Sequence, residues 1–445
     1  MKTFITIIFF VVPLNLALGQ KSVSFIEADT STYRAYLNSD WNRIIEVGNM
    51  ALESGVDYYY LRLRMGYAFF MKSRYGLAIP HYRKALEFSN NDAIALEFLY
   101  YCYRYTARDN DAEKLTTKFT PALKTYLKKE NTRRITNLGF YTTFGTGAVS
   151  SLKEDINLSA PTLYEGRQIL PNSFTNFNFQ LSHSISKSII LRHSANLLYK
   201  DEYAFAVVNS IPYISESQVI RQFNYHIGAD ITPITGFTLT PVFSYINYRI
   251  PVFYEYGTGS GKNRNVFTYN THKETAFGIK GGIRSGIVKV SLAGSHSNLN
   301  LSFQNTVAIS LNVFPMSNLN LYLTASGYLH SQKQNDSGIQ QFIQSYLVGF
   351  RPIKQLWIEG GATIGGFSNF YDPFSELIYN SLELYNSLGN VNLIFPYYKS
   401  GISLFASYRY YSSESMFVPV EDVFETENHK TIKYQSYTIG LSWKL

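Results

Sequence analysis

Apolar and polar residues alternate one by one through the carboxy-terminal two thirds of the chain. Between Leu319 and Ser326, every odd position is apolar and nearly every even position is polar. Successive side chains of a β-strand point to opposite faces, so this period of two predicts strands with one apolar and one polar face. The pattern recurs to the end of the chain and predicts fourteen strands. They lie near 136–149, 174–186, 188–200, 218–232, 237–250, 272–284, 287–299, 301–314, 319–331, 341–351, 356–369, 384–395, 401–413 and 431–445.

The connections between these strands alternate between long and short. Long links follow the first, third and fifth strands, whereas short turns are expected at Lys187, at Pro233–Gly236 and at Ser285–Gly286. With one exception near Asn300, the alternation continues to the last strand. In an up-and-down barrel every second connection lies on the same rim. The sequence therefore predicts one rim with long loops and one with short turns. An even strand number puts both ends of the barrel at the short-turn rim.

Strands of this kind, with long loops at one rim and short turns at the other, resemble those of outer-membrane β-barrels. The end of the chain also resembles the terminal assembly signal of those barrels, with Thr438, Gly440, Trp443 and Leu445 at its four positions. The resemblance implies two partners, the outer-membrane lipid and the barrel-assembly machinery. The alternative, a secreted β-sandwich or propeller, predicts blade-like repeats of about 40 to 50 residues, and the sequence has none.

The first residues have the features of an export signal. Lys2 precedes the apolar run from Phe4 to Val12, and the small residues Ala17–Gly19 follow. This order is that of a secretory signal peptide, so we expect residues 1–19 to be removed. A retained anchor helix is the alternative, but the run is interrupted by Pro13 and is short for a membrane span. The expected units are a signal peptide at 1–19, a helical domain at 20–135 and a barrel at 136–445.

Residues 30–130 repeat with a period of 34. At this offset Trp41 aligns with Tyr75, and Ala51–Ser54 aligns with Ala85–Phe88. The period and its small and aromatic positions resemble the tetratricopeptide repeat, a pair of antiparallel helices that stacks on its neighbours. The resemblance implies two to three units, which would bind a periplasmic protein. The packing positions it implies are Gly66, Phe69, Ala78, Tyr82 and Ala85.

Composition excludes several other classes of protein. After the first 20 positions no run approaches the roughly 20 apolar residues that a membrane-spanning helix needs. The single cysteine, Cys102, excludes a disulfide framework within one chain.

Lysine and arginine number 40 against 32 acidic residues, a net charge of +8. The part before position 136 holds 19 basic and 13 acidic residues. That excess is compatible with a basic face for an acidic protein segment or an anionic polymer, or with a solvated helix surface. Nucleic acid is not expected as a partner of an exported chain.

The polar positions of the predicted strands supply the candidate functional residues. By parity, eight charged or polar side chains point into the lumen: Arg192, Asn224, His226, Asp230, Lys280, Lys289, Glu359 and Arg409. Charges facing lipid would cost about 2–4 kcal/mol for Arg or Lys at mid-depth, so we expect these side chains to face water or one another. They form either a polar conduit or a ladder of interior salt bridges. No catalytic residue, cofactor or metal site is expected.

Two-part α + β chains of this kind, with helical repeats before an antiparallel transmembrane barrel of about 14 strands, resemble exopolysaccharide-export porins in architecture. Our first hypothesis is an outer-membrane transport or export component for a polysaccharide or another polymer, with a periplasmic docking module. The second is a non-conducting anchor that recruits periplasmic partners. A lipid-modifying enzyme is third. It would need a His and a Ser two positions apart on one strand face, and no predicted strand has this pair.

Overall fold

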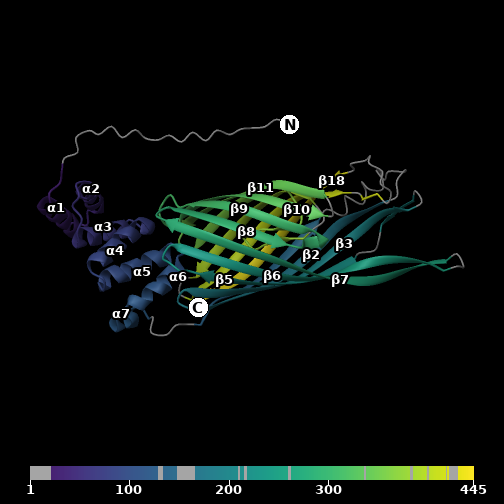
Figure 1. Cartoon of the computed structure of the whole chain (residues 1–445), viewed down its shortest axis with the longest axis horizontal. Helices are drawn as coiled ribbons and strands as arrows, with labels where there is room; N and C mark the ends of the chain where they lie inside the picture. The colour runs from purple at the N-terminus through teal and green to yellow at the C-terminus, as the bar shows by residue number, and fades with distance from the viewer. Residues whose placement is uncertain are drawn as a thin grey trace, which may run out of the picture.

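The computed structural model describes residues 22–128, 134–147, 166–208, 211–214, 218–258, 262–334, 337–380, 384–397, 400–416, 418–419 and 429–445. Within these ranges, seven α-helices precede a closed antiparallel barrel of fourteen strands (Figure 1). The predicted two-part α + β architecture and strand number are therefore confirmed. The expected signal peptide lies outside the described residues. Among the described residues, no helix combines the length and the apolar character needed to cross a bilayer.

Six of the helices form three consecutive antiparallel pairs with the predicted period. The first helices of the pairs begin at residues 25, 59 and 93, and the second helices begin at 41, 75 and 109, so each offset is 34 residues. The seventh helix follows the third pair. The bounds are α1 (Phe25–Leu37), α2 (Trp41–Glu53), α3 (Tyr59–Met71), α4 (Tyr75–Phe88), α5 (Ala93–Tyr105), α6 (Asp109–Leu115) and α7 (Pro121–Tyr126).

The sequence comparison aligns α2 with α4 but identifies no counterpart of α3 before α2, and helix α1 supplies that counterpart. The residues that α1 buries are Ala28, Thr32 and Ala35. Because these side chains are small, they give a weak apolar stripe and the helix is hard to recognise from its pattern. Its first turn is fixed by Ser24, whose hydroxyl accepts a hydrogen bond from the backbone N–H of Glu27. The helical part therefore contains three complete pairs.

The five packing positions implied by the tetratricopeptide resemblance all lie in the core of the helical part. Phe69, Ala78, Tyr82 and Ala85 are buried, as is Gly66. A Cβ atom at Gly66 would lie 3.0 Å from the Tyr82 ring. The glycine therefore allows helices α3 and α4 to approach closely enough for that ring to pack between them.

The barrel closes because β1 pairs with both β2 and β18. Each predicted strand overlaps a strand of the barrel, and β2, β3, β6 and β7 are much longer than predicted. The fourteen strands are β1 (Ile135–Gly147), β2 (Gly166–Ser186), β3 (Ile189–Val208), β5 (Gln218–Ile231), β6 (Phe237–Thr258), β7 (Lys262–Ser285), β8 (Val288–Ser297), β9 (Phe303–Val313), β10 (Leu321–Gln334), β11 (Ser337–Ile353), β12 (Leu356–Phe367), β15 (Leu384–Tyr397), β16 (Ile402–Met416) and β18 (His429–Lys444). Two short strands, β4 (Ile211–Ile214) and β17 (Val418–Pro419), extend the sheet locally.

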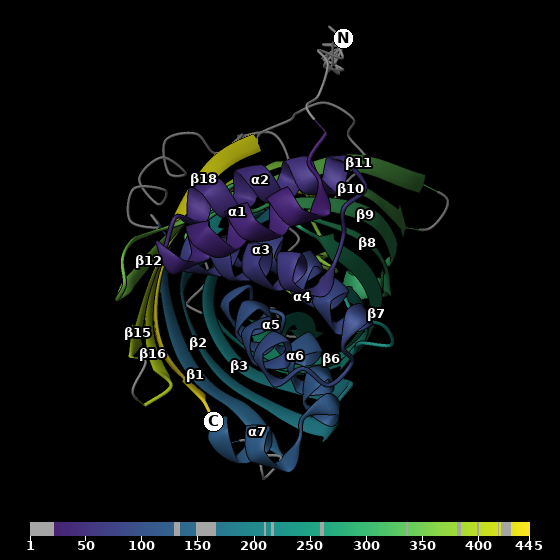
Figure 2. The same ribbon diagram turned by 90° about the vertical axis from the view of Figure 1, so that its left-hand side faces the viewer.

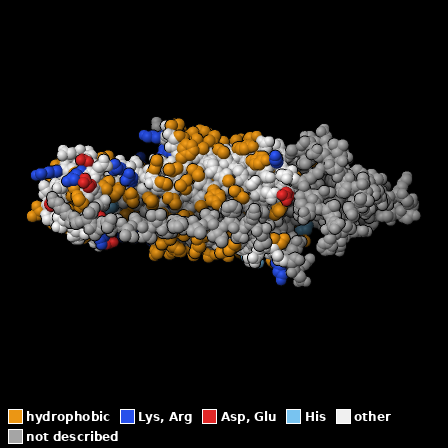
Figure 3. Space-filling view, turned by 90° about the horizontal axis from the view of Figure 1, so that it is seen from above, with side chains coloured by type: hydrophobic (Ala, Val, Ile, Leu, Met, Phe, Trp, Pro, Cys, Tyr) orange, Lys and Arg blue, Asp and Glu red, His pale blue; other side chains and the backbone are white. Residues whose placement is uncertain are grey.

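Side chains alternate between the outside and the inside of the barrel. On β7, Phe277 and Ile279 are half exposed on the outer wall, whereas the intervening Gly278 and the following Lys280 face inward. Apolar side chains form a belt along the outer wall (Figure 3). A belt of this kind is the surface that a barrel presents to hydrocarbon, while its polar positions face the interior.

The last strand and the residue that follows it carry the four positions of the expected assembly signal. The Thr438 hydroxyl lies 2.8 Å from that of Thr143 on β1. Gly440 leaves space for the ring of Tyr141, also on β1. The Trp443 indole donates to the carbonyl of Ser400 at 3.0 Å, and the Leu445 N–H donates to the carbonyl of Thr136 at 3.1 Å. The contacts of Thr438, Gly440 and Leu445 join the end of the chain to β1, and that of Trp443 joins it to the turn before β16.

The helical domain, defined here as α1–α7, lies across the short-turn mouth of the barrel (Figure 2). Near α4, the N–H of Gly76 donates to the Ser317 carbonyl and the N–H of Leu77 donates to its hydroxyl, both at 2.8 Å. Asn318 donates to the carbonyl of Ser73 at 2.9 Å. Ser317 and Asn318 belong to the turn between β9 and β10, so this turn is hydrogen-bonded to the start of α4.

A second group of contacts joins α6 to the turn between β5 and β6. The Asp111 carboxylate accepts from the N–H of Gly236 at 3.0 Å and from Arg108 at 2.7 Å. The ammonium group of Lys114 donates to the carbonyls of Thr232 and Pro233. Further bonds link Lys187 to Thr116, Arg284 to Thr106 and Lys444 to Asp109. The helical domain is therefore attached at several points around the rim.

Candidate functional site: a loop across the barrel lumen

The connection between β12 and β15 folds into the barrel. We refer to its residues 368–380 as the lumen loop. It contains a small hairpin of β13 (Phe370–Tyr371) and β14 (Ile378–Tyr379). Phe370 and Tyr371 are 2% and 1% exposed, in contrast to the half-exposed apolar residues on the outer wall. The sequence pattern predicts an ordinary outer link at this position, and the structure corrects that prediction.

Aromatic side chains hold one end of the lumen loop against the wall. The Phe370 ring packs edge-on against Tyr328 and His330 of β10, at centroid distances of 5.4 and 5.3 Å. Phe367 of β12 packs edge-on against Phe370 and Tyr379 of the loop, at centroid distances of 5.6 and 5.2 Å. The loop is also bonded to the β8–β9 connection, where the side chain of Asn300 donates to Asn369 and to the carbonyl of Asn380. These contacts come from several walls, so the loop crosses the interior.

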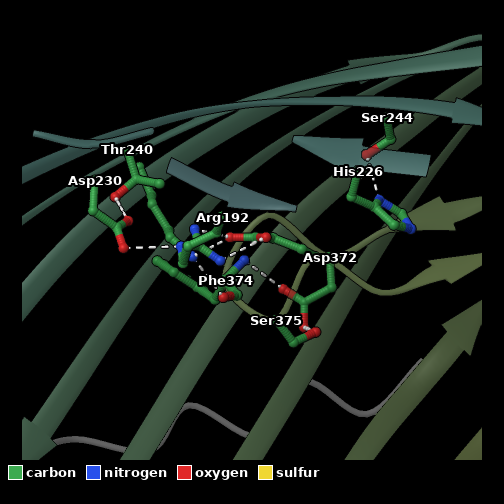
Figure 4. A network of polar contacts seen from close by, with 10 residues as sticks. Arg192, His226, Asp230, Thr240, Ser244, Asp372, Phe374 and Ser375 are labelled. Atoms are coloured by element: carbon green, nitrogen blue, oxygen red, sulfur yellow. Dashed lines mark hydrogen bonds and ion pairs between the residues drawn. The ribbon is translucent and has the colours of Figure 1, made fainter. Parts of the chain in front are cut away.

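An ionic network holds the turn between β13 and β14 (Figure 4). The Glu376 carboxylate accepts two bonds from the Arg192 guanidinium of β3, at 3.0 and 2.6 Å, and one from the Lys280 ammonium of β7, at 2.8 Å. Arg192 also donates to Asp230 of β5 at 2.8 Å. Asp230 in turn accepts from the Thr240 hydroxyl at 2.8 Å. The network therefore bonds the loop directly to β3 and β7, and Arg192 extends it to Asp230 of β5 and Thr240 of β6.

Asp372 shapes the turn that presents Glu376. Its carboxylate accepts from the N–H of Phe374 at 2.8 Å and from the Ser375 hydroxyl at 2.6 Å. The carbonyl of Phe374 then accepts from Lys280 at 3.0 Å. Glu376 itself adopts a left-handed backbone conformation, with φ of 61°. Such a conformation is unfavourable for a residue with a side chain, so the surrounding contacts maintain it.

Lys289 lies close to this network on the lumen side of β8. Its side chain passes 3.1 Å from the position that a Cβ at Gly282 would take, and Gly282 is two residues beyond Lys280 on β7. Lys289 makes no ion pair with any residue in the described ranges. We call Arg192, Lys280 and Lys289 the basic cluster. Its three cations face two carboxylates, those of Asp230 and Glu376.

The structure brings together only some of the eight lumen-facing candidates. Arg192, Asp230 and Lys280 belong to the network just described, and Lys289 lies beside it. His226 lies 2.7 Å from the Ser244 hydroxyl, and Asn224 accepts from Gln222 at 2.9 Å. The remaining two lie apart from the network. Glu359 is hydrogen-bonded to Tyr322 and Asn392, and Arg409 lies near enough to Tyr379 of the loop for its charge to interact with that side chain.

Sequence reasoning missed the loop residues Asp372 and Glu376. Period-two parity applies to strands, and these residues lie outside any predicted strand. One signal was available, because the stretch from Phe370 to Tyr379 contains Phe370, Tyr371, Phe374, Leu377, Ile378 and Tyr379. A loop exposed to water would not be expected to carry so many large apolar residues. This composition is typical of a segment that packs against something.

The pair of His226 and Ser244 has the separation of a general base and a nucleophile. The two residues lie on neighbouring strands and are 18 positions apart in the sequence, so they do not have the two-residue spacing of a pair on one strand. Ser244 is fully buried and His226 is 7% exposed. Among the described residues, no hydrogen bond joins a third group to His226, as a catalytic triad would require. The pair therefore satisfies two polar groups inside the barrel. No cluster of His, Cys, Asp or Glu in the described ranges could hold a metal ion.

Comparison with known proteins gives similarity of barrel shape only. No protein-family model matches the chain, and no curated protein sequence matches it. A solved FadL homologue from Pseudomonas aeruginosa is 9% identical, with a TM-score of 0.43 over 74% of this chain and 94% of that one. The toluene transporter TodX of P. putida is 6% identical, with a TM-score of 0.40 over 73% and 92% of the two chains.

A third solved structure is the translocator domain of the autotransporter NalP from Neisseria meningitidis. It is 9% identical, with a TM-score of 0.31 over 77% of this chain and 99% of that one. These identities and TM-scores are too low to indicate a shared activity. The function of this chain must therefore be inferred from its own lumen and rim.

Proposed function

We propose that this chain is an outer-membrane transport or export component in which the barrel is a conduit and the lumen loop restricts it. The observation that carries the proposal is the polar attachment of the loop. Its Glu376 is held by Arg192 and Lys280, whose side chains remain 31% and 23% exposed. Because water reaches these groups, the ion pairs can be exchanged for hydration when the loop moves. A permanent plug would be better served by apolar packing alone.

The helical domain faces the periplasm in this proposal. Support comes from the topology, because fourteen strands place the helical domain and the carboxyl terminus on the short-turn rim. Short turns are periplasmic in outer-membrane barrels. The expected signal peptide would supply export to that compartment.

The three helix pairs serve as a tetratricopeptide-type docking module in this proposal. Support comes from the 34-residue period and from the exposed apolar side chains on α1, where Phe25, Ile26 and Leu37 are 55%, 76% and 63% exposed. The rim contacts described above involve residues 73–77 and 106–116 of the helical domain, so they leave these side chains of α1 available to a periplasmic protein. A polysaccharide or another polymer is the cargo suggested by the architecture.

A non-conducting anchor is the second candidate. The position of the helical domain across one mouth favours it, because a barrel covered at one end and crossed by a loop can serve to hold the helices at the membrane (Figure 2). The two candidates differ in what happens when the obstructions are removed.

Planar-bilayer conductance of the purified protein separates them. We expect the intact chain to show small or brief openings. Replacing Asp372–Tyr379 with a Gly-Ser linker of equal length should give a steady conductance at least several-fold larger, because the linker lacks Glu376, Tyr379 and the other side chains that hold the loop across the lumen. The matched control is Glu414→Gln, which changes a carboxylate on β16 and leaves the loop intact. A loop-replaced barrel that stays closed, also when it begins at residue 134, would exclude the conduit and support the anchor.

A further inference from the structure

Glu376 is bound in the way that a protein binds a carboxylate ligand. Both of its oxygens accept from the Arg192 fork, and Lys280 donates to one of them at 2.8 Å. Paired, parallel bonds between a guanidinium and a carboxylate give geometric specificity as well as charge attraction. The wall therefore contains a carboxylate-binding site, and the protein's own loop occupies it.

The site does not depend on Glu376 for its shape. Arg192 is already oriented by its 2.8 Å bond to Asp230, which is itself fixed by Thr240. A Cβ atom at Gly228 would lie 3.0 Å from the Arg192 guanidinium, so the glycine leaves that group its space. All of these residues belong to the barrel strands. The guanidinium would therefore stay in place if the loop moved away.

Removing Glu376 would also leave the site with excess positive charge. The three cations of the basic cluster would then face Asp230 alone. Lys289, which has no ion-pair partner among the described residues, is near enough for its charge to interact with Lys280 and Asp230. An unpaired group of cations inside a barrel attracts anions. The vacated site would therefore need a replacement carboxylate.

We infer that the basic cluster binds the carboxylate group of a solute passing through the barrel, and that Glu376 is a resident substitute which the solute displaces. The inference rests on the proposed conduit function and names its substrate class: acidic sugars or other carboxylate-bearing solutes. Binding of the solute and seating of the loop are then mutually exclusive. The left-handed backbone at Glu376 favours release, because an unfavourable conformation is relieved when the loop leaves.

Saturation-transfer difference NMR on the full chain in detergent micelles tests this inference without measuring current. Sodium glucuronate is the probe and glucose is its matched neutral counterpart, differing at the carboxylate. We expect glucuronate to bind and glucose not to bind. Glu376→Gln should tighten glucuronate binding about tenfold or more, because an internal competitor lowers apparent affinity by the fraction of time it occupies the site. Glu359→Gln, a lumen carboxylate bonded to other residues, is the control and should behave as wild type.

Arg192→Lys supplies a second variant that keeps the charge and loses the fork. In the Glu376→Gln background it should weaken glucuronate binding about tenfold. Trigalacturonate, measured alongside, separates the two sources of the group: tighter binding than glucuronate points to an acidic polymer, and equal binding points to a small solute.

The inference is overturned if Glu376→Gln leaves glucuronate binding unchanged, if glucose binds equally well, or if inorganic phosphate binds more tightly than glucuronate. The conductance measurement tests the conduit separately. A protein that binds glucuronate but never conducts would contradict the proposed transport function and leave the carboxylate-binding site in place.

Discussion

At the scale of single residues, the charges of the helical domain are largely paired with one another. Arg62 makes two bonds to Asp57, at 2.7 and 2.8 Å, and Arg64 makes one to Asp29 at 2.7 Å. The Arg62 guanidinium lowers the pKa of Asp57 below its usual value. The basic face suggested by the sequence is therefore partly neutralised. Asp29 precedes Arg64 by 35 residues, so this pairing could not be read from local sequence.

His81 predicts how the stability of the helical domain depends on pH. It is buried against Phe69 and lies 3.3 Å from Arg62. Burial lowers its pKa to about 4, and the charge of Arg62 contributes in the same direction. At pH values below about 6.5, the ordinary pKa of histidine, His81 binds a proton in the unfolded chain but stays neutral in the folded domain until the pH approaches 4. Stability should therefore fall as the pH drops from about 7 towards 4, by about 2 kcal/mol at pH 5.

The measurement uses Trp41, which lies in α2, as a fluorescent reporter. With Trp357→Phe and Trp443→Phe, it is the one tryptophan left in the chain. The urea midpoint of its transition should be lower at pH 5 than at pH 7. His81→Gln should abolish most of the difference, because no other histidine precedes position 136. An equal pH dependence in that variant would assign the effect to carboxylates instead.

At the scale of elements, the sequence predicted those parts of the fold that have a regular period. The strands of the barrel and the 34-residue offset of the helices both follow from repeated apolar positions. Helix α1 was missed because its buried side chains are small, and the lumen loop was missed because it has no period. The basic cluster was partly predictable from parity. Its partner Glu376 was not, because loop and wall meet only after the barrel has closed.

The apolar outer wall predicts a position-dependent cost for a buried charge. Ile309 on β9 is 54% exposed and pairs with Leu292 and Gly327 near the middle of their strands. Ile309→Arg should destabilise the barrel by about 2–4 kcal/mol, as expected for a cation at the bilayer midplane. Leu301→Arg, in the β8–β9 connection, is the control and should cost about 1 kcal/mol or less.

The temperature at which the folded, fast-migrating band disappears on semi-native gels measures this difference after reconstitution into vesicles. Equal temperatures for the two variants would contradict a lipid-facing position of Ile309.

At the scale of the whole molecule, the two parts are joined by a polar interface around the short-turn rim. A larger residue at position 76 should separate the two parts at this interface. A Cβ atom there would lie 2.7 Å from the Ser317 hydroxyl and 3.0 Å from the Gly286 carbonyl. Gly76→Val should therefore separate α4 from the rim and raise amide hydrogen exchange in residues 73–77 about tenfold or more, while Trp41 fluorescence stays unchanged.

Ala93→Val provides the matched control. Ala93 is exposed and lies in the first turn of α5, just as Gly76 lies in the first turn of α4. It should leave exchange in residues 73–77 at the wild-type rate. Wild-type exchange in Gly76→Val would show that the turn carrying Ser317 does not hold the helical domain.

The polar character of that interface bears on the order in which the molecule is built. The helices are synthesised before the barrel, and the rim they contact does not exist until the final strand has joined the first. During this interval the future contact surface is surrounded by water. Asp111 and Arg108 already satisfy one another within α6 and its cap, at 2.7 Å. A polar surface of this type stays soluble before the barrel has closed. It then replaces bound water with hydrogen bonds to the turns of the rim, without exposing apolar side chains that would aggregate or attract chaperones.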